Sequence, residues 1–325
     1  MIIVAKTILI TGAGGRMGRY IARILVEKGH TVHSLVQNKE QALALPSGTV
    51  PYLGDINNQK VVGAACHDVD VVMHFAAIVS EYKATTEQIL NTNVVGTRTL
   101  LDACKDNGVK KFIFPSTVDV YGRWRKERLN EESELKPTDK YGYSKMLAEN
   151  LIREESESMG YVIMRLAAAY GPGFEGSFFK LIALIKDGKA YLIGDGDNYL
   201  SIVHVSDIAQ GFMLAMDKNA SNGKTFNISD GQDHTQKQLF SLTAELLHVQ
   251  KPNKQISNII MNLMAKTKDI DSDEMRFLTS NRRIDISKAL KELGYKPKVG
   301  IEKGTMELIE AFNEKQRYSE KRLIA

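Results

Sequence analysis

The sequence contains very little cysteine. Cys66 and Cys104 are the only two among 325 residues, and they stand far apart, without a Cys-x-x-Cys pair or a Cys/His cluster. This shortage excludes a disulfide-rich scaffold and the common zinc motifs, so we expect no metal site. We therefore expect both cysteines to be reduced thiols with a structural role in a cytoplasmic protein.

Long apolar runs and a strong charge of one sign are also missing. No stretch approaches the roughly 20 apolar residues that a membrane helix needs, and residues 1–10 are too short and too strand-like for a signal peptide. The net charge of +4 is small for this length and is dispersed, so it indicates neither a nucleic acid nor a membrane surface as a partner. We therefore expect a small molecule as the partner.

Strand and helix patterns alternate along the first half of the chain. With 43% hydrophobic and 25% charged residues, the composition is that of an ordinary globular protein. The alternation predicts an α/β fold, a doubly wound Rossmann-like parallel sheet with helices on both faces. The strand patterns cover residues 2–10, 31–36, 69–75, 111–115 and 161–165; the helix patterns end at residue 28 and cover residues 87–107 and 140–159.

The second half of the chain is more mixed. Because 325 residues exceed the roughly 250–300 at which a single core stops growing, we expect a dinucleotide-binding domain over 1–173 and a smaller substrate domain over 174–325. Some segments of the second domain are expected to return to the sheet. Residues 266–283 are polar and lack periodicity, and either a lid over the substrate or a surface loop fits them. Helices are expected over 177–186 and 235–247, and short strands over 191–193 and 202–205.

A glycine-rich turn follows the first strand. The segment Thr11-Gly12-Ala13-Gly14-Gly15-Arg16-Met17-Gly18 joins that strand to a helix, and a second strand follows. This is the βαβ setting in which such a turn binds a dinucleotide. Gly12 permits the tight turn, Gly15 lets the backbone approach a pyrophosphate at the helix N-terminus, and Gly18 allows close packing of helix and strand.

A tyrosine and a lysine stand four residues apart in Tyr141-Gly142-Tyr143-Ser144-Lys145. On a helix this spacing puts Tyr141 and Lys145 on one face, whereas Tyr143 points elsewhere. A nearby ammonium favours the phenolate and lowers a tyrosine pKa from its reference value of about 10. The pair is therefore a candidate acid–base group near neutral pH.

Taken in order, these motifs resemble those of the extended short-chain dehydrogenases/reductases, also called the NAD-dependent epimerase/dehydratase family. The resemblance covers nearly the whole chain, to about Pro297. It is carried by Gly12-x-x-Gly15-x-x-Gly18, Gly54-Asp55-Ile56, His74-Phe75-Ala76-Ala77, Asn93-Val94-Val95-Gly96-Thr97, Ser116-Thr117-Val118-Asp119-Val120-Tyr121-Gly122, Tyr141 with Lys145, Arg165, Tyr170-Gly171-Pro172-Gly173, His204-Val205-Ser206-Asp207 and Asn227-Ile228.

The resemblance implies a site and a mechanism. Tyr141 exchanges a proton with an alcohol or ketone, Lys145 holds the ribose and lowers the pKa of Tyr141, and Thr117 hydrogen-bonds the reacting oxygen. It also implies a homodimer through the helix of Tyr141 and its neighbour beginning near Glu87. The implied cofactor contacts are Gly12, Gly14, Gly15, Arg16, Met17, Gly18, Gln37, Asp55, Ile56, Phe75, Ala76, Ala77, Asn93, Tyr141 and Lys145; the implied substrate contacts are Val79, Thr117, Val118, Asp119 and Ala168.

Departures from the family pattern bear on the substrate. Nucleotide-sugar members usually carry Asn where this chain has Ala168 and Arg where it has Leu200, and neither replacement offers a pyrophosphate a charge or a donor. Val118 replaces the first member of the acidic pair that dehydratases need, which leaves only Asp119. Residues 123–126 have the sequence Arg-Trp-Arg-Lys. They could bind an anionic substrate or form a solvated loop that one Trp anchors, and the loop is slightly favoured.

Three functions remain open. The first is an NAD(P)-dependent oxidoreductase that interconverts a secondary alcohol and a ketone on a small molecule. The second is a UDP-sugar 4-epimerase with tightly bound NAD, which Ala168 and Leu200 disfavour. The third is a non-enzymatic redox sensor, which the retained Tyr141 and Lys145 disfavour.

The choice between NAD and NADP is open as well. An acid at the end of the second strand would indicate NAD and an arginine NADP. Val36-Gln37-Asn38-Lys39 offers neither. The missing acid, with Lys39 and Arg16 nearby, favours NADP weakly.

Overall fold

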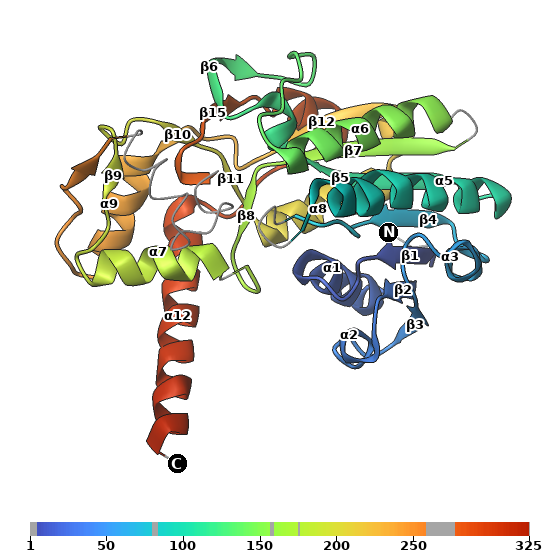
Figure 1. Ribbon diagram of the computed structural model, residues 1–325, viewed down its shortest axis with the longest axis horizontal. Coiled ribbons are helices and arrows are strands. Elements are labelled where there is room, and N and C mark those ends of the chain that lie inside the picture. The colour runs from blue at the N-terminus through green and yellow to red at the C-terminus, as the bar shows by residue number, and fades with distance from the viewer. Residues whose placement is uncertain (1–4, 80–83, 157–158, 175, 258–276, 325) are drawn as a thin grey trace.

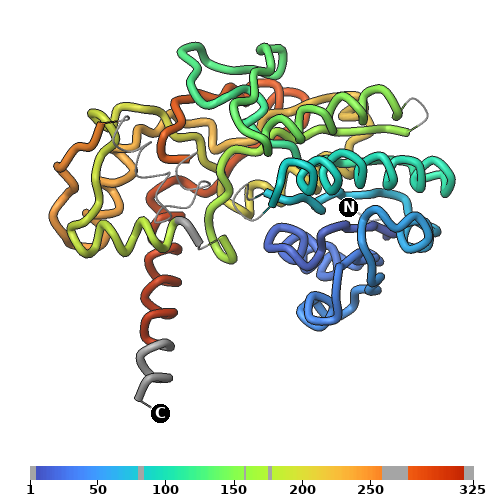
Figure 2. The backbone as a smooth tube through the Cα atoms, in the orientation of Figure 1, coloured from blue at the N-terminus to red at the C-terminus, as the bar shows by residue number. Residues whose placement is uncertain are grey.

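A computed structural model describes residues 5–79, 84–156, 159–174, 176–257 and 277–324, as the ribbon and the tube show (Figures 1 and 2). Its centre is a seven-stranded parallel sheet in the order β12-β7-β5-β4-β1-β2-β3. The elements of the first half are β1 (Thr7–Thr11), α1 (Arg16–Glu27), β2 (Thr31–Val36), α2 (Lys39–Leu43), β3 (Thr49–Leu53), α3 (Gln59–Cys66), β4 (Val71–His74), α4 (Thr86–Leu90), η1 (Asn91–Val95), α5 (Gly96–Asp106), β5 (Lys111–Thr117), η2 (Val118–Tyr121), β6 (Trp124–Leu129), α6 (Lys140–Glu155) and β7 (Gly160–Leu166).

Both faces of the sheet are buried. In β1 the side chains of Ile8 and Ile10 enter one core and Leu9 enters the other, because successive strand residues point to opposite faces. Helix α1 covers the first core through Ile21 and Leu25. Helices α3, α5 and α6 cover the second core on the opposite face of the sheet. The predicted doubly wound sheet is therefore confirmed.

Several predicted boundaries shift. The first strand begins at Thr7, and residues 2–4 of the predicted strand lie outside the described residues. The helix predicted over 87–107 consists of α4, a π-helical turn at η1 and α5. The helix predicted to 159 ends at Glu155. Cys66 and Cys104, distant in sequence, are both fully buried where α3 packs against α5, and burial and the neighbouring thiol raise the pKa of Cys104.

The second half of the chain forms a smaller part and also returns to the sheet. Strand β12 hydrogen-bonds to β7 at the sheet's edge, and α8 packs against the same face as α1. The boundary near residue 173 stays a prediction. The elements are β8 (Ala168–Tyr170), α7 (Gly176–Lys186), β9 (Leu192–Ile193), β10 (Tyr199–Leu200), β11 (Ile202–His204), α8 (Val205–Asp217), η3 (Asn219–Ser221), β12 (Lys224–Ile228), β13 (His234–Thr235), α9 (Gln236–Leu246), β14 (Gln255–Ile256), β15 (Asn281–Ile284), η4 (Ala289–Leu293) and α12 (Ile301–Ile324).

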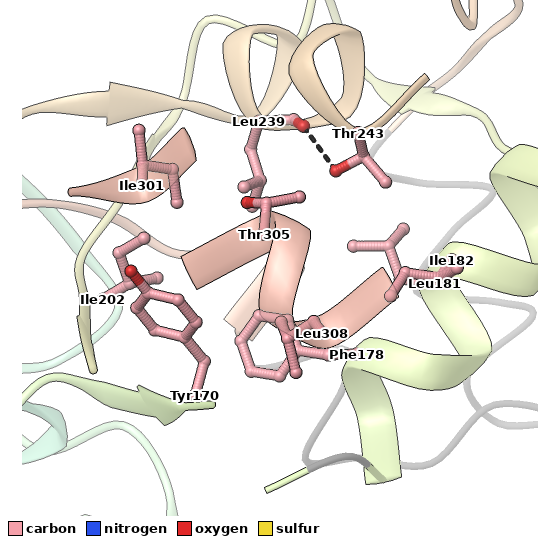
Figure 3. Close-up of a pocket in the computed structure, with 10 residues that line it drawn as sticks. All are labelled: Tyr170, Phe178, Leu181, Ile182, Ile202, Leu239, Thr243, Ile301, Thr305 and Leu308. Atoms are coloured by element: carbon pink, nitrogen blue, oxygen red, sulfur yellow. Dashed lines mark hydrogen bonds between the residues drawn. The ribbon is translucent and has the colours of Figure 1, made fainter. Parts of the chain in front are cut away.

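Helices α7, α9 and α12 enclose a small apolar cavity of about 20 Å³, shown in Figure 3. Its few polar groups include the Thr243 hydroxyl, which donates to the Leu239 carbonyl. A space of this size holds one water only where several polar partners line it, so we expect this cavity to stay dry. The cavity lies within the core of the smaller part, and none of the predicted site residues lines it.

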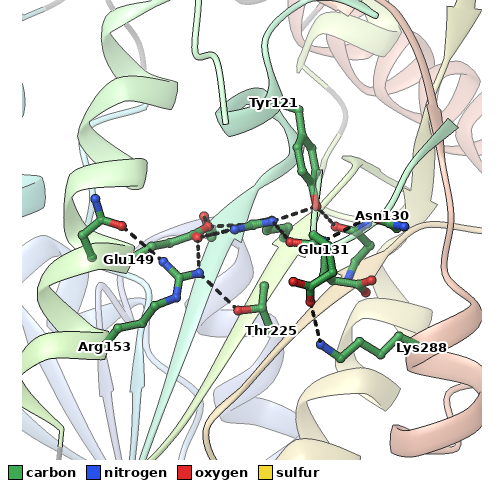
Figure 4. A network of polar contacts seen from close by, with 12 residues as sticks. Tyr121, Asn130, Glu131, Glu149, Arg153, Thr225 and Lys288 are labelled. Carbon is green, nitrogen blue, oxygen red and sulfur yellow. Dashed lines mark hydrogen bonds and ion pairs between the residues drawn. The ribbon is translucent and has the colours of Figure 1, made fainter. Parts of the chain in front are cut away.

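A buried ion pair ties α6 to the sheet (Figure 4). The Arg165 guanidinium donates through Nη2 to Glu149 Oε2 at 2.7 Å and through Nε to Oε1 at 3.0 Å. Glu149 also accepts from Ser116 Oγ at 2.5 Å, and Arg165 Nη1 donates to the Tyr121 hydroxyl at 2.8 Å. Burial alone would raise the pKa of Glu149, but Arg165 lowers it below its ordinary value. The Ser116 hydroxyl therefore binds Glu149 of α6 and is not directed at a substrate.

Replacing Glu149 by glutamine is expected to destabilise the fold by about 3–5 kcal/mol, because the buried Arg165 loses its counter-charge. Chemical denaturation gives the free energy of unfolding. The matched control is Glu155→Gln on the same helix, whose carboxylate pairs with Arg98 and Lys105 at the partly exposed surface. That variant is expected to lose less than about 1 kcal/mol. Equal losses in the two variants would contradict the role of the buried pair.

Candidate active site

The glycine turn is packed so tightly that only glycine fits. Gly12 has φ of +67°, and a Cβ there would lie 2.6 Å from the Ala76 backbone nitrogen. A Cβ on Gly18 would lie 2.4 Å from the Gly12 carbonyl oxygen. Gly15 comes directly before α1, so the backbone N–H groups of its first turn are exposed to a ligand. Such a helix N-terminus against a glycine cradle fits a dinucleotide pyrophosphate.

Substitution of Gly18 by alanine is expected to weaken NAD⁺ binding at least about tenfold and to cost about 1–3 kcal/mol of stability, because the Gly12 backbone must shift. Calorimetric titration and chemical denaturation measure the two effects. The control is Gly63→Ala within α3, where an added Cβ would meet nothing within 4 Å apart from its chain neighbours and the backbone of its own helix. That variant is expected to gain about 0.5–1 kcal/mol and to bind NAD⁺ unchanged, and a similar loss of binding in both would refute this account.

A fully buried polar chain connects the end of β1, where this turn begins, with β4 and α5. Thr11 Oγ1 lies 2.6 Å from His74 Nδ1, and His74 Nε2 lies 2.9 Å from Thr97 Oγ1. Because the Thr97 hydroxyl donates to the Asn93 carbonyl, it accepts from His74, and this assigns the Nε2–H tautomer. Burial, and secondarily the charge of Lys145, lower the pKa of His74 to about 3. His74 is therefore a neutral structural link.

Asn93 fixes the segment that follows β4. Its side chain accepts from Ile78 N and donates to the Ile78 carbonyl and to Ser144 Oγ on α6. The predicted contacts Phe75, Ala76 and Ala77 are thereby held half-buried between the turn and α6, and Val79 is exposed. Direct binding of the cofactor by Asn93 stays a prediction, since these side-chain hydrogen bonds are to the protein itself.

Tyr141 and Lys145 lie one turn apart on α6, beside the end of β5. The Lys145 side chain is almost fully buried, and its Nζ lies 3.8 Å from the centre of the Phe114 ring. Burial lowers the pKa of Lys145 to about 7, against an opposing effect of Glu149. Tyr141 is half-buried, whereas Tyr143 is 46% exposed, as the helical spacing predicts. Thr117 is the last residue of β5 and is buried.

The adenosine end of the expected site has a feature that sequence reasoning missed. The Gln41 side chain accepts from Gln37 N at 3.0 Å and lies where a Cβ on Gly14 would point. Asn38 caps the short helix α2 that positions Gln41. The predicted contacts Arg16 and Asp55 are exposed, Met17 is half-buried and Ile56 is buried. The one sequence signal that could have identified Gln41 is Asn38, because asparagine favours the N-cap of a helix.

On the substrate side, the structure qualifies two predictions. The Val118 side chain is buried in the main core, so only its backbone can meet a substrate. Leu200 is buried in the apolar core of the smaller part with Leu239 and Phe240, so it does not line a ligand site. Ala168 is half-buried in β8. Asp119 lies beside Thr117, whose hydroxyl donates to its carboxylate at 3.1 Å.

The expectations for two polar segments need correction. The part of 266–283 that the structure describes is not a loop, because β15 pairs with β6 and Arg282 is buried; residues 266–276 lie outside the described residues. Trp124, expected to anchor a solvated loop, begins β6 and is 54% exposed. It lines a cavity of about 400 Å³ whose other residues include Asp195, Asp197 and Asn281.

Comparisons with known proteins identify the family of this chain. The family model described as the NAD dependent epimerase/dehydratase family matches residues 8–229. The chain therefore belongs to this family, and the resemblance of its motifs is confirmed. It is an enzyme of the extended short-chain dehydrogenase/reductase type.

Two relatives and one solved structure illustrate the range of the family. The chain is 28% identical to UDP-glucose 4-epimerase of Vibrio cholerae, over 94% of this chain and 95% of the relative. It is 24% identical to a decarboxylating sterol-4-alpha-carboxylate 3-dehydrogenase of Dictyostelium discoideum, over 93% and 100%. The structure of UDP-glucose 4-epimerase from Thermotoga maritima with UDP-glucose superposes with a TM-score of 0.79 at 26% identity, covering 95% of this chain and 99% of that one. Among the described residues, no helix combines the length and the apolar character of a membrane span.

Proposed function

We propose that this protein interconverts a secondary alcohol and a ketone on a small molecule, with Tyr141 as the acid–base group. The observation that carries the proposal is the buried Lys145, one helical turn from Tyr141 and beside the end of β5. Tyr141 takes the alcohol proton in oxidation and returns it in reduction, while Lys145 stabilises the phenolate. Thr117 binds the reacting oxygen. NAD, when bound, accepts or returns the hydride.

NAD is the dinucleotide that we propose. The family is described by its dependence on NAD, and the glycine cradle fits the pyrophosphate that NAD and NADP share. The preference for NADP rested on the missing acid after the second strand together with Lys39 and Arg16 nearby, and both of these basic side chains are exposed. The neutral Gln41 beside Gly14 offers a 2′-phosphate no positive charge.

The substrate is proposed to lack a pyrophosphate. Neither Ala168 nor the buried Leu200 can bind such a dianion, and the cavity beside Trp124 carries Asp195 and Asp197. The second candidate is a UDP-sugar 4-epimerase, in which the same three residues oxidise and then reduce one sugar carbon. The full-length similarity to UDP-glucose 4-epimerases favours it. A sensor without catalysis does not account for the buried Lys145.

We further propose a homodimer through α4, η1, α5 and α6, in the cytoplasm. Val95 and Tyr143 leave apolar surface exposed on these helices, at 48% and 46%. Light scattering of the parent is expected to give twice the mass of one chain, and a Val95→Asp/Tyr143→Asp double variant is expected to give one. A monomeric parent would refute the dimer. The two buried free thiols support a reducing compartment.

The function is tested by following nicotinamide absorbance with NAD⁺ or NADP⁺ and a panel of secondary alcohols and UDP-sugars, with product analysis of the same samples. Net reduction of the cofactor by an alcohol supports the first candidate and identifies the preferred cofactor. Conversion of UDP-glucose without net absorbance change establishes the epimerase. A protein that turns over no member of the panel contradicts both.

A further inference from the structure

Two side chains of α6 contact two side chains of β5. Lys145 and Glu149 stand one helical turn apart on α6, and Phe114 and Ser116 stand two residues apart on one face of β5. Glu149 accepts from Ser116 Oγ at 2.5 Å, and Lys145 Nζ lies 3.8 Å from the centre of the Phe114 ring. The helix is therefore joined to the strand by a hydrogen bond at Glu149 and by an aromatic ring at Lys145.

The Lys145 ammonium makes no hydrogen bond or ion pair with any residue that the structure describes. The carboxylate one turn along the helix, Glu149, is bound instead by Arg165 and Arg153. Lys145 and Phe114 are 2% and 1% exposed, so water is nearly excluded from their contact. The negative face of an aromatic ring attracts a cation, and the attraction is stronger where water is excluded.

The Phe114 ring is itself fixed by a neutral neighbour. Its centre lies 5.8 Å from that of the His74 ring, at an interplanar angle of 34°. Hydrogen bonds with Thr11 and Thr97 hold this imidazole, which is uncharged near neutral pH. A neutral imidazole does not compete with the ammonium for the face of the ring.

We propose that Phe114 is a positioning residue, whose ring holds the Lys145 ammonium beside the end of β5 so that its charge acts on Tyr141. This inference rests on the proposed function, in which Lys145 stabilises the Tyr141 phenolate. A carboxylate in place of the ring would form an ion pair with Lys145 and offset the positive charge that the phenolate needs. A ring face attracts the ammonium and leaves its charge uncompensated.

The first test needs neither substrate nor cofactor. Trifluorophenylalanine at position 114 keeps the ring but withdraws electrons from its face, which weakens the attraction for a cation. Well below pH 7, where Lys145 is charged in the folded protein, this change is expected to lower the folded-to-unfolded ratio about two- to tenfold. Well above pH 7 Lys145 is neutral in the folded protein, and only a constant packing effect is expected to remain. Phe114→Leu, which removes the ring, is expected to show the same pH dependence with a larger amplitude.

The same ring change in a Lys145→Met background separates the charge from the packing. The other titratable groups near the ammonium, His74 on β4 and Tyr141 and Glu149 on α6, are present in both backgrounds. Burial lowers the pKa of His74 to about 3; burial would raise that of Glu149, but Arg165 holds it below its ordinary value. In the Lys145→Met background the fluorinated ring is therefore expected to change the ratio by one factor at every pH.

Phe112 is the matched control for the ring. It lies two residues earlier on the same face of β5, is fully buried, and its ring centre is also 5.8 Å from that of His74. No ammonium or guanidinium of the described residues lies over the Phe112 ring. Trifluorophenylalanine at position 112 is expected to change the ratio equally at every pH. The same pH dependence at both positions, or none at position 114, overturns the inference and leaves the proposed function standing.

The second test follows turnover with saturating NAD⁺ and the alcohol of the panel that the parent oxidises fastest. Because Lys145 must be charged to stabilise the phenolate, kcat/KM is expected to fall as this group loses its proton at high pH. The fluorinated ring at position 114 is expected to move this fall to lower pH, through a proton affinity reduced about two- to tenfold. The fluorinated ring at position 112 is expected to leave it in place.

The two tests fail in different ways. A pH-dependent change in stability without a shift of the fall in kcat/KM shows that the ring only stabilises the fold, and it overturns the positioning role. A parent that oxidises no member of the panel contradicts the proposed function, and the denaturation experiment still decides whether Phe114 holds the Lys145 ammonium.

Discussion

Replacing Lys145 by methionine is expected to remove most of the activity and, at the same time, to stabilise the free protein. The ammonium supports the Tyr141 phenolate in the proposed mechanism, so its loss is expected to lower turnover by about 10²–10⁴-fold. The same ammonium is buried against the Phe114 ring, and burial lowers its pKa to about 7. Methionine fills the space without a charge to desolvate.

The gain in stability depends on pH in a defined direction. The ordinary pKa of Lys145 is 10.5 and its pKa in the folded protein is about 7. Between these values the unfolded chain holds a proton that the folded protein has released, so the free energy of unfolding of the parent rises with pH. One group contributes at most about 1.4 kcal/mol per pH unit. The advantage of Lys145→Met is therefore largest at or below pH 7 and disappears toward pH 10.5.

Chemical denaturation of parent and variant at several pH values, without cofactor, measures this difference. Burial also lowers the pKa of Lys111, to about 8. Because Lys111 is present in both proteins, its contribution to the pH dependence cancels in the comparison. Lys140→Met is the matched control, because Lys140 is exposed at the start of the same helix. A Lys145→Met protein less stable than the parent at pH 6 would show that the ammonium stabilises the free fold.

A Tyr141→Phe variant is expected to keep its fold and its NAD⁺ affinity and to lose about 10²–10⁴-fold in turnover, as when a positioned acid–base group is removed. The ring remains, so the packing of the half-buried side chain changes little. Turnover with the substrate found in the panel, calorimetric NAD⁺ titration and thermal unfolding give the three quantities.

Tyr143→Phe is the control for this variant. Tyr143 lies two residues along α6, is 46% exposed and faces away from Thr117 and Lys145. It is expected to match the parent in all three measurements. Full turnover in Tyr141→Phe would falsify the proposed mechanism, even if the protein proves to be a dehydrogenase by another route.

The sequence predicted best those features that depend on neighbours in the chain. A strand, a glycine turn and a helix follow one another within β1 and α1, and the chemistry of glycine at Gly12 and Gly18 is local. The face shared by Tyr141 and Lys145 follows from helical spacing alone. These arrangements required no knowledge of distant contacts.

The arrangements that sequence reasoning missed depend on contacts between separate elements of the folded chain. Arg282 reaches Asp119 across 163 residues, and nothing in the polar run around it distinguishes it from a surface arginine. Leu200 stands where nucleotide-sugar members usually carry an arginine, and its burial in the core of the smaller part could not be predicted from that position. Gln41 reaches Gly14 only because Asn38 starts a helix of five residues.

The position of β12 has a consequence for how the protein is made. The sheet is completed by Lys224–Ile228 beside β7, which ends at Leu166. A ribosome adds about 5–20 residues per second, so β7 waits several seconds with an unpaired edge while the intervening chain is synthesised. Exposed strand edges invite pairing with other chains, so this interval is the period in biosynthesis when a chaperone has most to protect.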